Sequence, residues 1–118
     1  MEEEEYENYI EINEETLFPF NDWVYDTILN RTLKELTEEN LVDLMELIQE
    51  GKREANGYLS LVYLEKREFK LLYRNMTRAY NRSIQAIRKT YLRKANNRLL
   101  REFKLLIDSF VKDDRFTE

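Results

Sequence analysis

The stretch from Phe69 to Ile107 constrains this chain most, because it contains neither glycine nor proline. Within it, apolar side chains return at steps of three and four residues. Successive residues of an α-helix are turned by about 100°, so these steps place the apolar side chains on one face. The pattern therefore predicts a long amphipathic helix. Its apolar positions are Phe69, Leu72, Tyr73, Met76, Tyr80, Ile84, Ile87, Tyr91, Ala95, Leu99, Phe103, Ile107 and Phe110.

A row of basic residues runs beside this apolar face. Basic side chains at helical spacing are typical of a surface that contacts phosphates or an acidic protein. They are equally typical of a solvated face, or of one that pairs with acidic residues of the same chain. The candidate contact residues for a partner or a nucleic acid are Lys70, Arg74, Arg78, Arg82, Lys89 and Arg93.

The net charge of −5 hides a sharp division along the chain. Residues 1–50 hold 16 acidic residues against two basic ones, a net charge of −14. Residues 51–107 hold 15 basic residues against four acidic ones, a net charge of +11. Either the acidic half folds back on the basic half, or the basic face is offered to a partner.

The composition excludes several classes of chemistry. The chain has no cysteine and no histidine, so it lacks disulfides, Cys-based zinc sites and the commonest general base. No Gly-rich phosphate loop, activated nucleophile or metal-ligand spacing occurs either. We therefore predict a non-enzymatic protein without metal or cofactor. The absence of an 18-residue apolar window and of a basic signal-peptide start predicts a cytoplasmic protein with no membrane partner.

The chain begins with an acidic stretch. Residues 1–16 are rich in glutamate and are expected to form a flexible segment, followed by one helical-bundle domain over residues 17–118. Within the acidic segment, Tyr9, Ile10 and Ile12 fit either a short helix or an extended arm laid on the core.

The densest aromatic cluster occupies residues 17–25. Pro19 disfavours helix for the residue before it. Asn21 or Asp22 can then cap a helix that runs to about Asn30. Trp23 in particular is expected to pack between helices. The predicted aromatic anchors are Phe18, Phe20 and Trp23.

A second helix is predicted before the long one. Residues 32–35 have the Thr-x-x-Glu pattern of a capping box. From Glu38 to Glu50 the apolar residues follow a helical stripe, and Gly51 occupies the position of a left-handed C-terminal cap.

An unbroken helix over residues 58–111 would be about 80 Å long at 1.5 Å per residue. A domain of this size has a radius of gyration of about 14 Å, so one monomer could not cover such a rod. Asn96–Asn97 is the predicted break, with a very long helix before it and a final helix to about Lys112. The alternative is an unbroken helix covered by a second subunit. The predicted fold is an all-α bundle of four to five helices built around one very long helix, without a β-sheet.

Three segments resemble the helical domain of GINS-complex subunits. Residues 71–78, followed by Arg82 and Ile84, look like its basic central helix. Residues 39–50 are similar to the acidic and apolar helix before it, and residues 99–111 to the helix that closes the domain.

The resemblance covers about residues 38–112 in order. Tyr80 stands where an arginine is expected, and the small β-domain of GINS subunits has no counterpart. The resemblance implies a non-catalytic scaffold subunit of a DNA-replication assembly that joins the MCM helicase to a RecJ-like partner. We accordingly expect a protein–protein interaction function in a homo- or hetero-oligomer.

Two other functions stay open. Residues 23–25 ahead of residues 32–37 resemble helical immunity proteins of contact-dependent inhibition systems, which implies an inhibitor whose acidic half blocks a partner's active site. The second alternative is nucleic-acid binding through the basic helix, with Tyr73, Tyr80 and Tyr91 stacked on unpaired bases. These tyrosines lie on the apolar face, where a place in the core is the competing interpretation.

Overall fold

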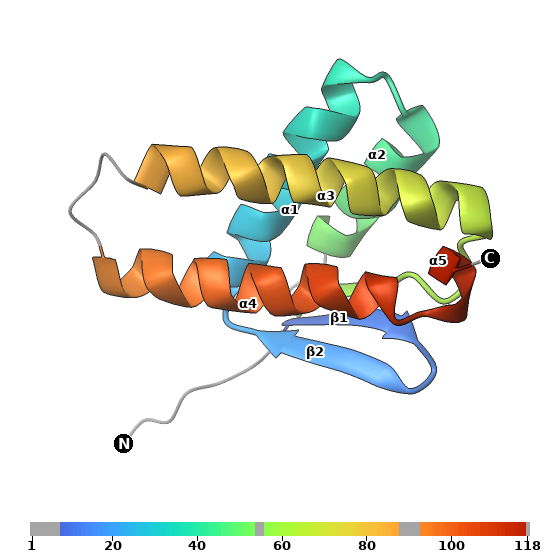
Figure 1. Cartoon of the computed structure of the whole chain (residues 1–118), viewed down its shortest axis with the longest axis horizontal. Coiled ribbons are helices and arrows are strands. Elements are labelled where there is room, and N and C mark those ends of the chain that lie inside the picture. The colour runs from blue at the N-terminus through green and yellow to red at the C-terminus, as the bar shows by residue number, and fades with distance from the viewer. Residues whose placement is uncertain (1–7, 54–55, 88–92, 118) are drawn as a thin grey trace.

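The structure is a computed structural model that describes residues 8–53, 56–87 and 93–117 (Figure 1). In this part of the chain, three strands and five helices fill a molecule whose longest dimension is 41 Å. Their bounds are β1 Asn8–Asn13, β2 Thr16–Phe20, α1 Asp22–Glu38, α2 Val42–Arg53, β3 Tyr58–Ser60, α3 Lys66–Ile87, α4 Arg93–Val111 and α5 Asp114–Thr117.

The sheet shows that the prediction of an all-α fold without a β-sheet is wrong. β1 lies in the middle, antiparallel to β2 and parallel to β3. Burial alternates along β1, with the side chains of Ile10 and Ile12 fully buried. Two β-branched residues on one face of a pleated strand bury well against helices, which favours the extended arm over the short helix. Within the predicted flexible segment, residues 8–15 therefore form β1 and the turn after it, and Thr16 begins β2.

The very long helix is also a wrong prediction. α3 ends at Ile87, and α4 runs back alongside it in the opposite direction (Figure 1). The pairing buries the apolar face that a single rod would expose, as ring pairs across the two helices show. The ring centroids of Phe69 and Phe110 are 4.6 Å apart, and those of Tyr80 and Phe103 are 5.7 Å apart.

The predicted break at Asn96–Asn97 lies inside α4. Asn96 is buried there, so this part of α4 faces the protein interior and is not a frayed helix end. Two predicted helix ends are wrong for a similar reason. Thr32 and Glu35 are buried in the interior of α1 and do not form a capping box, and Gly51 continues α2 without a positive φ. Tertiary contacts outweigh these local signals.

The start of α1 agrees with the sequence analysis. Asn21 has an extended backbone, and its Oδ1 accepts a hydrogen bond of 2.8 Å from the backbone N–H of Val24. Asp22 in the first turn adds a favourable interaction with the helix dipole.

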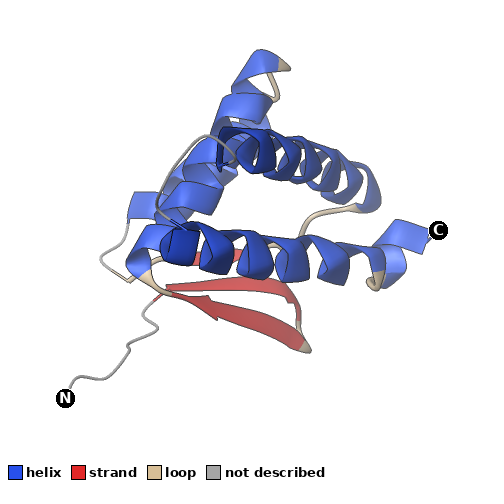
Figure 2. Ribbon diagram, turned by 60° about the vertical axis from the view of Figure 1, so that its left-hand side comes forward, coloured by secondary structure: helices blue, strands red, loops and turns tan. Residues whose placement is uncertain are grey.

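The helices cover one side of the sheet (Figure 2). α1 packs on α2 and α3, α3 packs on α4, and the inner face of the sheet contributes Ile10, Ile12 and Phe20 to the same core. The opposite face of the sheet is left uncovered by the described residues (Figures 1 and 2).

The C-terminal turn is fastened by Arg115. Its guanidinium group donates hydrogen bonds to the backbone oxygens of Ile12, Leu61 and Leu64, at 2.7–2.8 Å. Its Cζ lies 3.9 Å from the ring centroid of Phe69, a cation–π contact. Asp113 accepts a hydrogen bond of 2.9 Å from Nε of the same guanidinium group. One side chain thus ties the last turn to the sheet, to the loop after β3 and to α3.

Gly57 sits where the chain passes closest to the ring of Tyr25. A Cβ atom at this position would lie 2.7 Å from Cζ of Tyr25 and 2.8 Å from Oδ1 of Asn8. We expect Gly57→Ala to reduce the free energy of unfolding by about 1–3 kcal/mol, because the buried ring has little room to move. Urea denaturation measures the change.

Gly51→Ala is the matched control for this prediction. A Cβ atom there would lie 3.2 Å from Cβ of Leu59 and 3.2 Å from the hydroxyl oxygen of Tyr25, a less severe approach than at Gly57, and alanine gains helix propensity within α2. Equal losses of stability in the two variants would contradict the steric argument.

Asp113 gives the fold a defined response to acid. The hydrogen bond from Arg115 lowers the pKa of Asp113 from 3.8 to about 2, with a further hydrogen bond from Asn13. Because the folded-state pKa is depressed, the stabilisation is complete above the unfolded pKa and is lost as pH falls toward 2. We expect Asp113→Asn to lower the free energy of unfolding by about 2 kcal/mol at neutral pH, with the difference shrinking through this window.

Urea denaturation at a series of pH values tests this expectation, with Asp114→Asn as the control. Asp114 is exposed, and its carboxylate has no recorded hydrogen bond among the described residues. A constant difference between wild type and Asp113→Asn down to pH 2 would refute the assignment.

Candidate functional site

The predicted basic row meets the acidic half of the same chain. Arg74 and Arg78, one turn apart on α3, both bind the carboxylate of Glu39 at the C-terminal end of α1. The distance from Nη2 of Arg74 to Oε1 of Glu39 is 2.6 Å. The hydrogen bond from Arg74, together with the one from Arg78, lowers the pKa of Glu39.

Arg82 continues the same contact one turn further. Its Nη1 lies 3.2 Å from Oε2 of Glu35 and 3.5 Å from Oε1 of Glu38. Guanidinium groups near the carboxyl end of α1 also complement the helix dipole. Of the two interpretations of the charge division, these contacts favour the one in which the acidic half folds onto the basic half.

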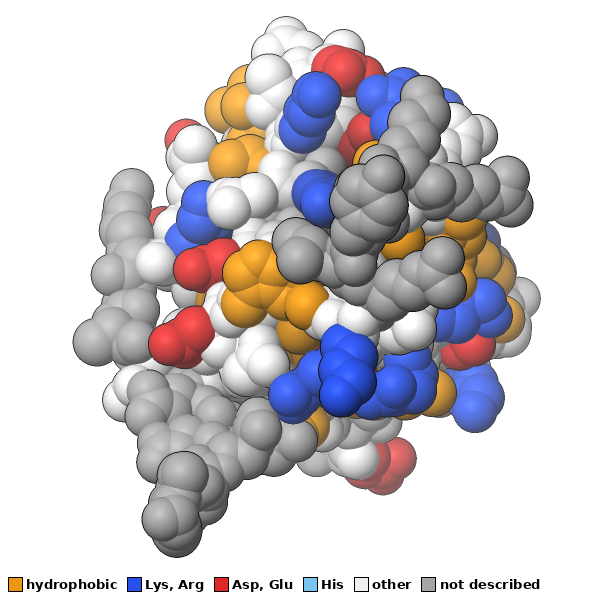
Figure 3. Space-filling view, turned by 90° about the vertical axis from the view of Figure 1, so that its left-hand side faces the viewer, with side chains coloured by type: hydrophobic (Ala, Val, Ile, Leu, Met, Phe, Trp, Pro, Cys, Tyr) orange, Lys and Arg blue, Asp and Glu red, His pale blue; other side chains and the backbone are white. Residues whose placement is uncertain are grey.

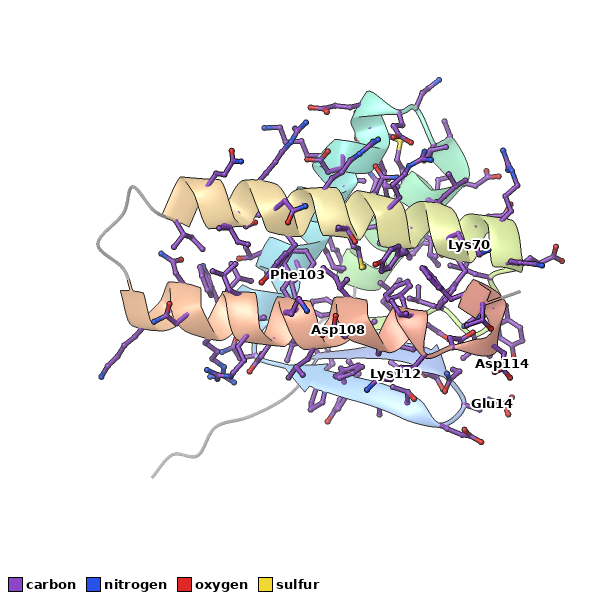
Figure 4. All side chains as sticks on the ribbon, in the orientation of Figure 1. Glu14, Lys70, Phe103, Asp108, Lys112 and Asp114 are labelled. Atoms are coloured by element: carbon purple, nitrogen blue, oxygen red, sulfur yellow. The ribbon has the colours of Figure 1, made fainter. Side chains whose placement is uncertain are left out.

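The other candidate cations are placed elsewhere. Lys70 lies near the C-terminal turn, with its Nζ 5.9 Å from the ring centroid of Phe116 (Figure 4). Arg93 begins α4, and Lys89 lies outside the described residues. Figure 3, which faces the end of the molecule where α3 ends and α4 begins, shows a group of Lys and Arg side chains there. The structure therefore places the described members of the predicted row on two helices, α3 and α4.

The three predicted aromatic anchors also lie in different surroundings. Phe20 is buried, and Phe18 stacks on it at 6.5 Å between ring centroids, on the inner face of the sheet. Trp23 is 45% exposed, so it does not pack in the core between helices as the sequence suggested. Tyr73 and Tyr80 pack against phenylalanine rings of α4, which supports a core role over base stacking.

The uncovered face of the sheet, which we call the outer sheet face, was missed by sequence reasoning. Pairing across the strands sets Pro19, Tyr9 and Tyr58 in one row. Leu17, Glu11 and Ser60 form the next row. Leu17 is 52% exposed and Tyr58 is 50% exposed, values that are high for large apolar side chains. The face is therefore an apolar and aromatic surface with a carboxylate at its centre.

The carboxylate of Glu11 is held in place by its neighbours on β3. The hydroxyl groups of Tyr58 and Ser60 both donate to its Oε1, the latter at 3.0 Å. The same hydrogen bond to Glu11 raises the pKa of Tyr58. With exposed Glu14 and Glu15 in the turn between β1 and β2, the sheet carries three carboxylates. Residues 8–20 and 58–60 contain no lysine or arginine.

The outer edge of β2, one of the two edge strands of the sheet, is protected against pairing with another strand. Tyr9 donates its backbone N–H to the oxygen of Gly57, and the oxygen of Glu11 accepts from Leu61, so these groups of β1 point toward β3. The backbone groups of the intervening residues point toward β2, which leaves those of Leu17 and Pro19 facing the free edge. Proline has no N–H to offer there, so contact through the face is favoured over strand addition.

Two of the surface pockets are lined by two or more basic residues. The first, about 400 Å³, lies at the end of the hairpin, and its lining mixes acidic residues with Lys112 and Arg115. Figure 4 labels Glu14, Lys112 and Asp114 at this end of the molecule. The second, about 260 Å³, lies between α1 and α3 and is lined by Arg31, Lys34, Glu35, Ala79, Arg82, Ser83 and Ala86.

Several possibilities find no counterpart in the described part of the chain. No group of three or more acidic side chains is arranged to hold a metal ion among the described residues. No described helix is long and apolar enough to cross a membrane. None of the family models, curated proteins or solved structures compared with the chain matches it.

Alternation at residues 8–13 was the available signal for the outer sheet face. In Asn-Tyr-Ile-Glu-Ile-Asn, the two isoleucines alternate with polar residues, as expected for a strand with one buried face. The signal is short, and β3 has only three residues. A strand of this length becomes identifiable only beside its partners.

Removing the two arginines that bind Glu39 should change how this carboxylate titrates. We expect Arg74→Gln combined with Arg78→Gln to raise the pKa of Glu39 toward its ordinary value, because both hydrogen bonds are lost. The stabilisation from this contact is present above the unfolded pKa and lost as pH falls through the lower folded pKa. An NMR titration of the glutamate side-chain carboxyl carbons measures the shift.

Arg67→Gln serves as the control for this titration. Arg67 lies on the same helix, its side chain is 80% exposed, and it contacts Glu68 at 3.8 Å. An unchanged pKa of Glu39 in the double variant would show that the carboxylate does not bind these arginines in solution.

Proposed function

We propose that this chain is a non-catalytic protein whose function is to bind another protein through the outer sheet face. The observation that carries the proposal is the double row of exposed Leu17, Pro19 and Tyr58 with Tyr9 and Glu11. Aromatic and apolar residues at the centre of a surface are the usual anchors of protein interfaces. Rigid strands present them without a large loss of conformational entropy on binding.

The charge of the face indicates the chemistry of the partner. Glu11, Glu14 and Glu15 lie on or beside it, and residues 8–20 and 58–60 contain no cation, while Lys112 and Arg115 line the pocket at the hairpin end together with Glu14 and Glu15. A partner with an apolar centre and a rim of lysine or arginine matches this arrangement, and the opposite charges would accelerate encounter. A second copy of the chain fits less well, since a symmetric contact would bring the two sets of carboxylates together.

This proposal bears differently on the three functions that the sequence left open. An acidic face suits both a scaffold subunit and an inhibitor that covers a basic cleft, and the two differ only in what the partner does. Nucleic-acid binding is less well supported, because Arg74 and Arg78 already share the carboxylate of Glu39. A GINS-like role in DNA replication, a place in a larger oligomer and a cytoplasmic location stay predictions.

Photo-crosslinking tests which surface meets the partner. A photoreactive phenylalanine analogue at Leu17 should capture a protein in cells of the source organism. The same analogue at Leu105, which is 54% exposed on α4, should not. With the captured protein purified, Leu17→Ser combined with Tyr58→Ser should weaken binding at least about tenfold, because both anchors are lost.

Two controls make this experiment decisive. Leu105→Ser removes an equally exposed leucine and should leave the dissociation constant unchanged. Glu14→Lys with Glu15→Lys should slow association most strongly at low salt, if the partner has a basic rim. Equal binding by wild type and the Leu17 and Tyr58 variant, or crosslinking of the chain to itself alone, would refute the proposal.

A further inference from the structure

The pocket between α1 and α3 has a physical origin in the sequence. Ala79, Ser83 and Ala86 follow one another at steps of four and three along α3, so their small side chains share one face. Opposite them, Arg31, Lys34 and Glu35 share one face of α1. Small residues facing long charged ones leave a hollow of about 260 Å³ that the helices do not fill.

Cations dominate the lining of this pocket. Arg31, Lys34 and Arg82 contribute three positive charges and Glu35 contributes one negative charge, a net charge of +2. Glu35 is buried and bound to Arg82 at 3.2 Å. It can therefore hold that guanidinium group in place, while Arg31 and Lys34 have no carboxylate partner among the described residues. Glu38, which is not part of the lining, contacts Arg82 from outside at 3.5 Å.

Both arginines are positioned with donors to spare. Nη1 of Arg31 donates to Oγ of Ser83 at 2.6 Å, and this hydroxyl group donates to the backbone oxygen of Ala79. The contacts of Arg82 with Glu35 and Glu38 both use Nη1. Nη2 and Nε of each guanidinium group therefore have no recorded partner among the described residues, and Lys34 has no recorded ion pair there.

We propose that this pocket binds a phosphate group, either as the free ion or as a phosphate monoester of a small molecule. A net charge of +2 matches a phosphate dianion, and guanidinium groups bind phosphate oxygens through pairs of parallel hydrogen bonds. Sites for complete drug-sized ligands occupy about 300–1,000 Å³, so a hollow of about 260 Å³, below this range, suits a single phosphate group better than a large molecule. The pocket lies on the helical side of the protein, apart from the outer sheet face, and this proposal is independent of the proposed function.

An NMR titration with inorganic phosphate, with chloride balancing the ionic strength, tests the proposal. We expect saturable shifts of backbone amides in residues 31–35 and 79–86. Lys34→Met should weaken binding about tenfold, because one charged contact is lost without disturbing a recorded contact of the fold. Arg31→Met should weaken it at least as much. Titration with O-phosphoserine then separates the two sources, since binding tighter than that of inorganic phosphate identifies a monoester site and weaker binding identifies a free-ion site.

Lys70→Met is the matched control, because Lys70 is an exposed lysine on α3 that does not line the pocket. This variant should bind phosphate as the wild type does. Shifts that do not saturate, shifts spread over all surface cations, or equal affinities of wild type and Lys34→Met would overturn the proposal.

Discussion

The closure of this fold depends on the guanidinium group of Arg115. It donates hydrogen bonds to backbone oxygens at the end of β1 and in the loop after β3, which precede it by 103, 54 and 51 residues. These oxygens lie where regular hydrogen bonding ends, and a buried carbonyl group without a partner is costly. The ring of Phe69 covers the other side of the same group. The sheet, the start of α3 and the end of α4 are thereby held at one point.

Elsewhere in the molecule, some charged side chains form ion pairs between helices and others stay unpaired at the surface. Between α1 and α3, acidic and basic side chains meet, and the pairs help to choose which helical faces contact each other more than they add stability. Ion pairing is incomplete both on the sheet and in the pocket between α1 and α3. The sheet keeps carboxylates without cations among residues 8–20 and 58–60, and the pocket beside Ala79 and Ser83 keeps cations in excess. These two local imbalances, and not the overall charge of −5, distinguish the surfaces on which the proposals rest.

Much of the helical structure could be predicted, and its failures have identifiable causes. The apolar spacing from Phe69 onward marks the buried face of α3 and α4, and Asn21 marks the start of α1. The same spacing continues across both helices, so it could not show that the chain reverses between Ile87 and Arg93. The basic row was visible as well, but which carboxylates it would meet was not. Glu39 lies 35 residues from Arg74 in the sequence, and no local pattern indicates that the two side chains meet.

The sequence by itself determined where helices form, which of their faces are apolar, and how acidic and basic residues are divided along the chain. These properties depend on neighbours within one or two helical turns. Only the tertiary structure decided the sheet, the reversal between α3 and α4 and the pocket between α1 and α3. Each of these brings together segments far apart in sequence. β1 is a strand because β2 and β3 lie on either side of it, a condition that the six residues of β1 cannot specify alone.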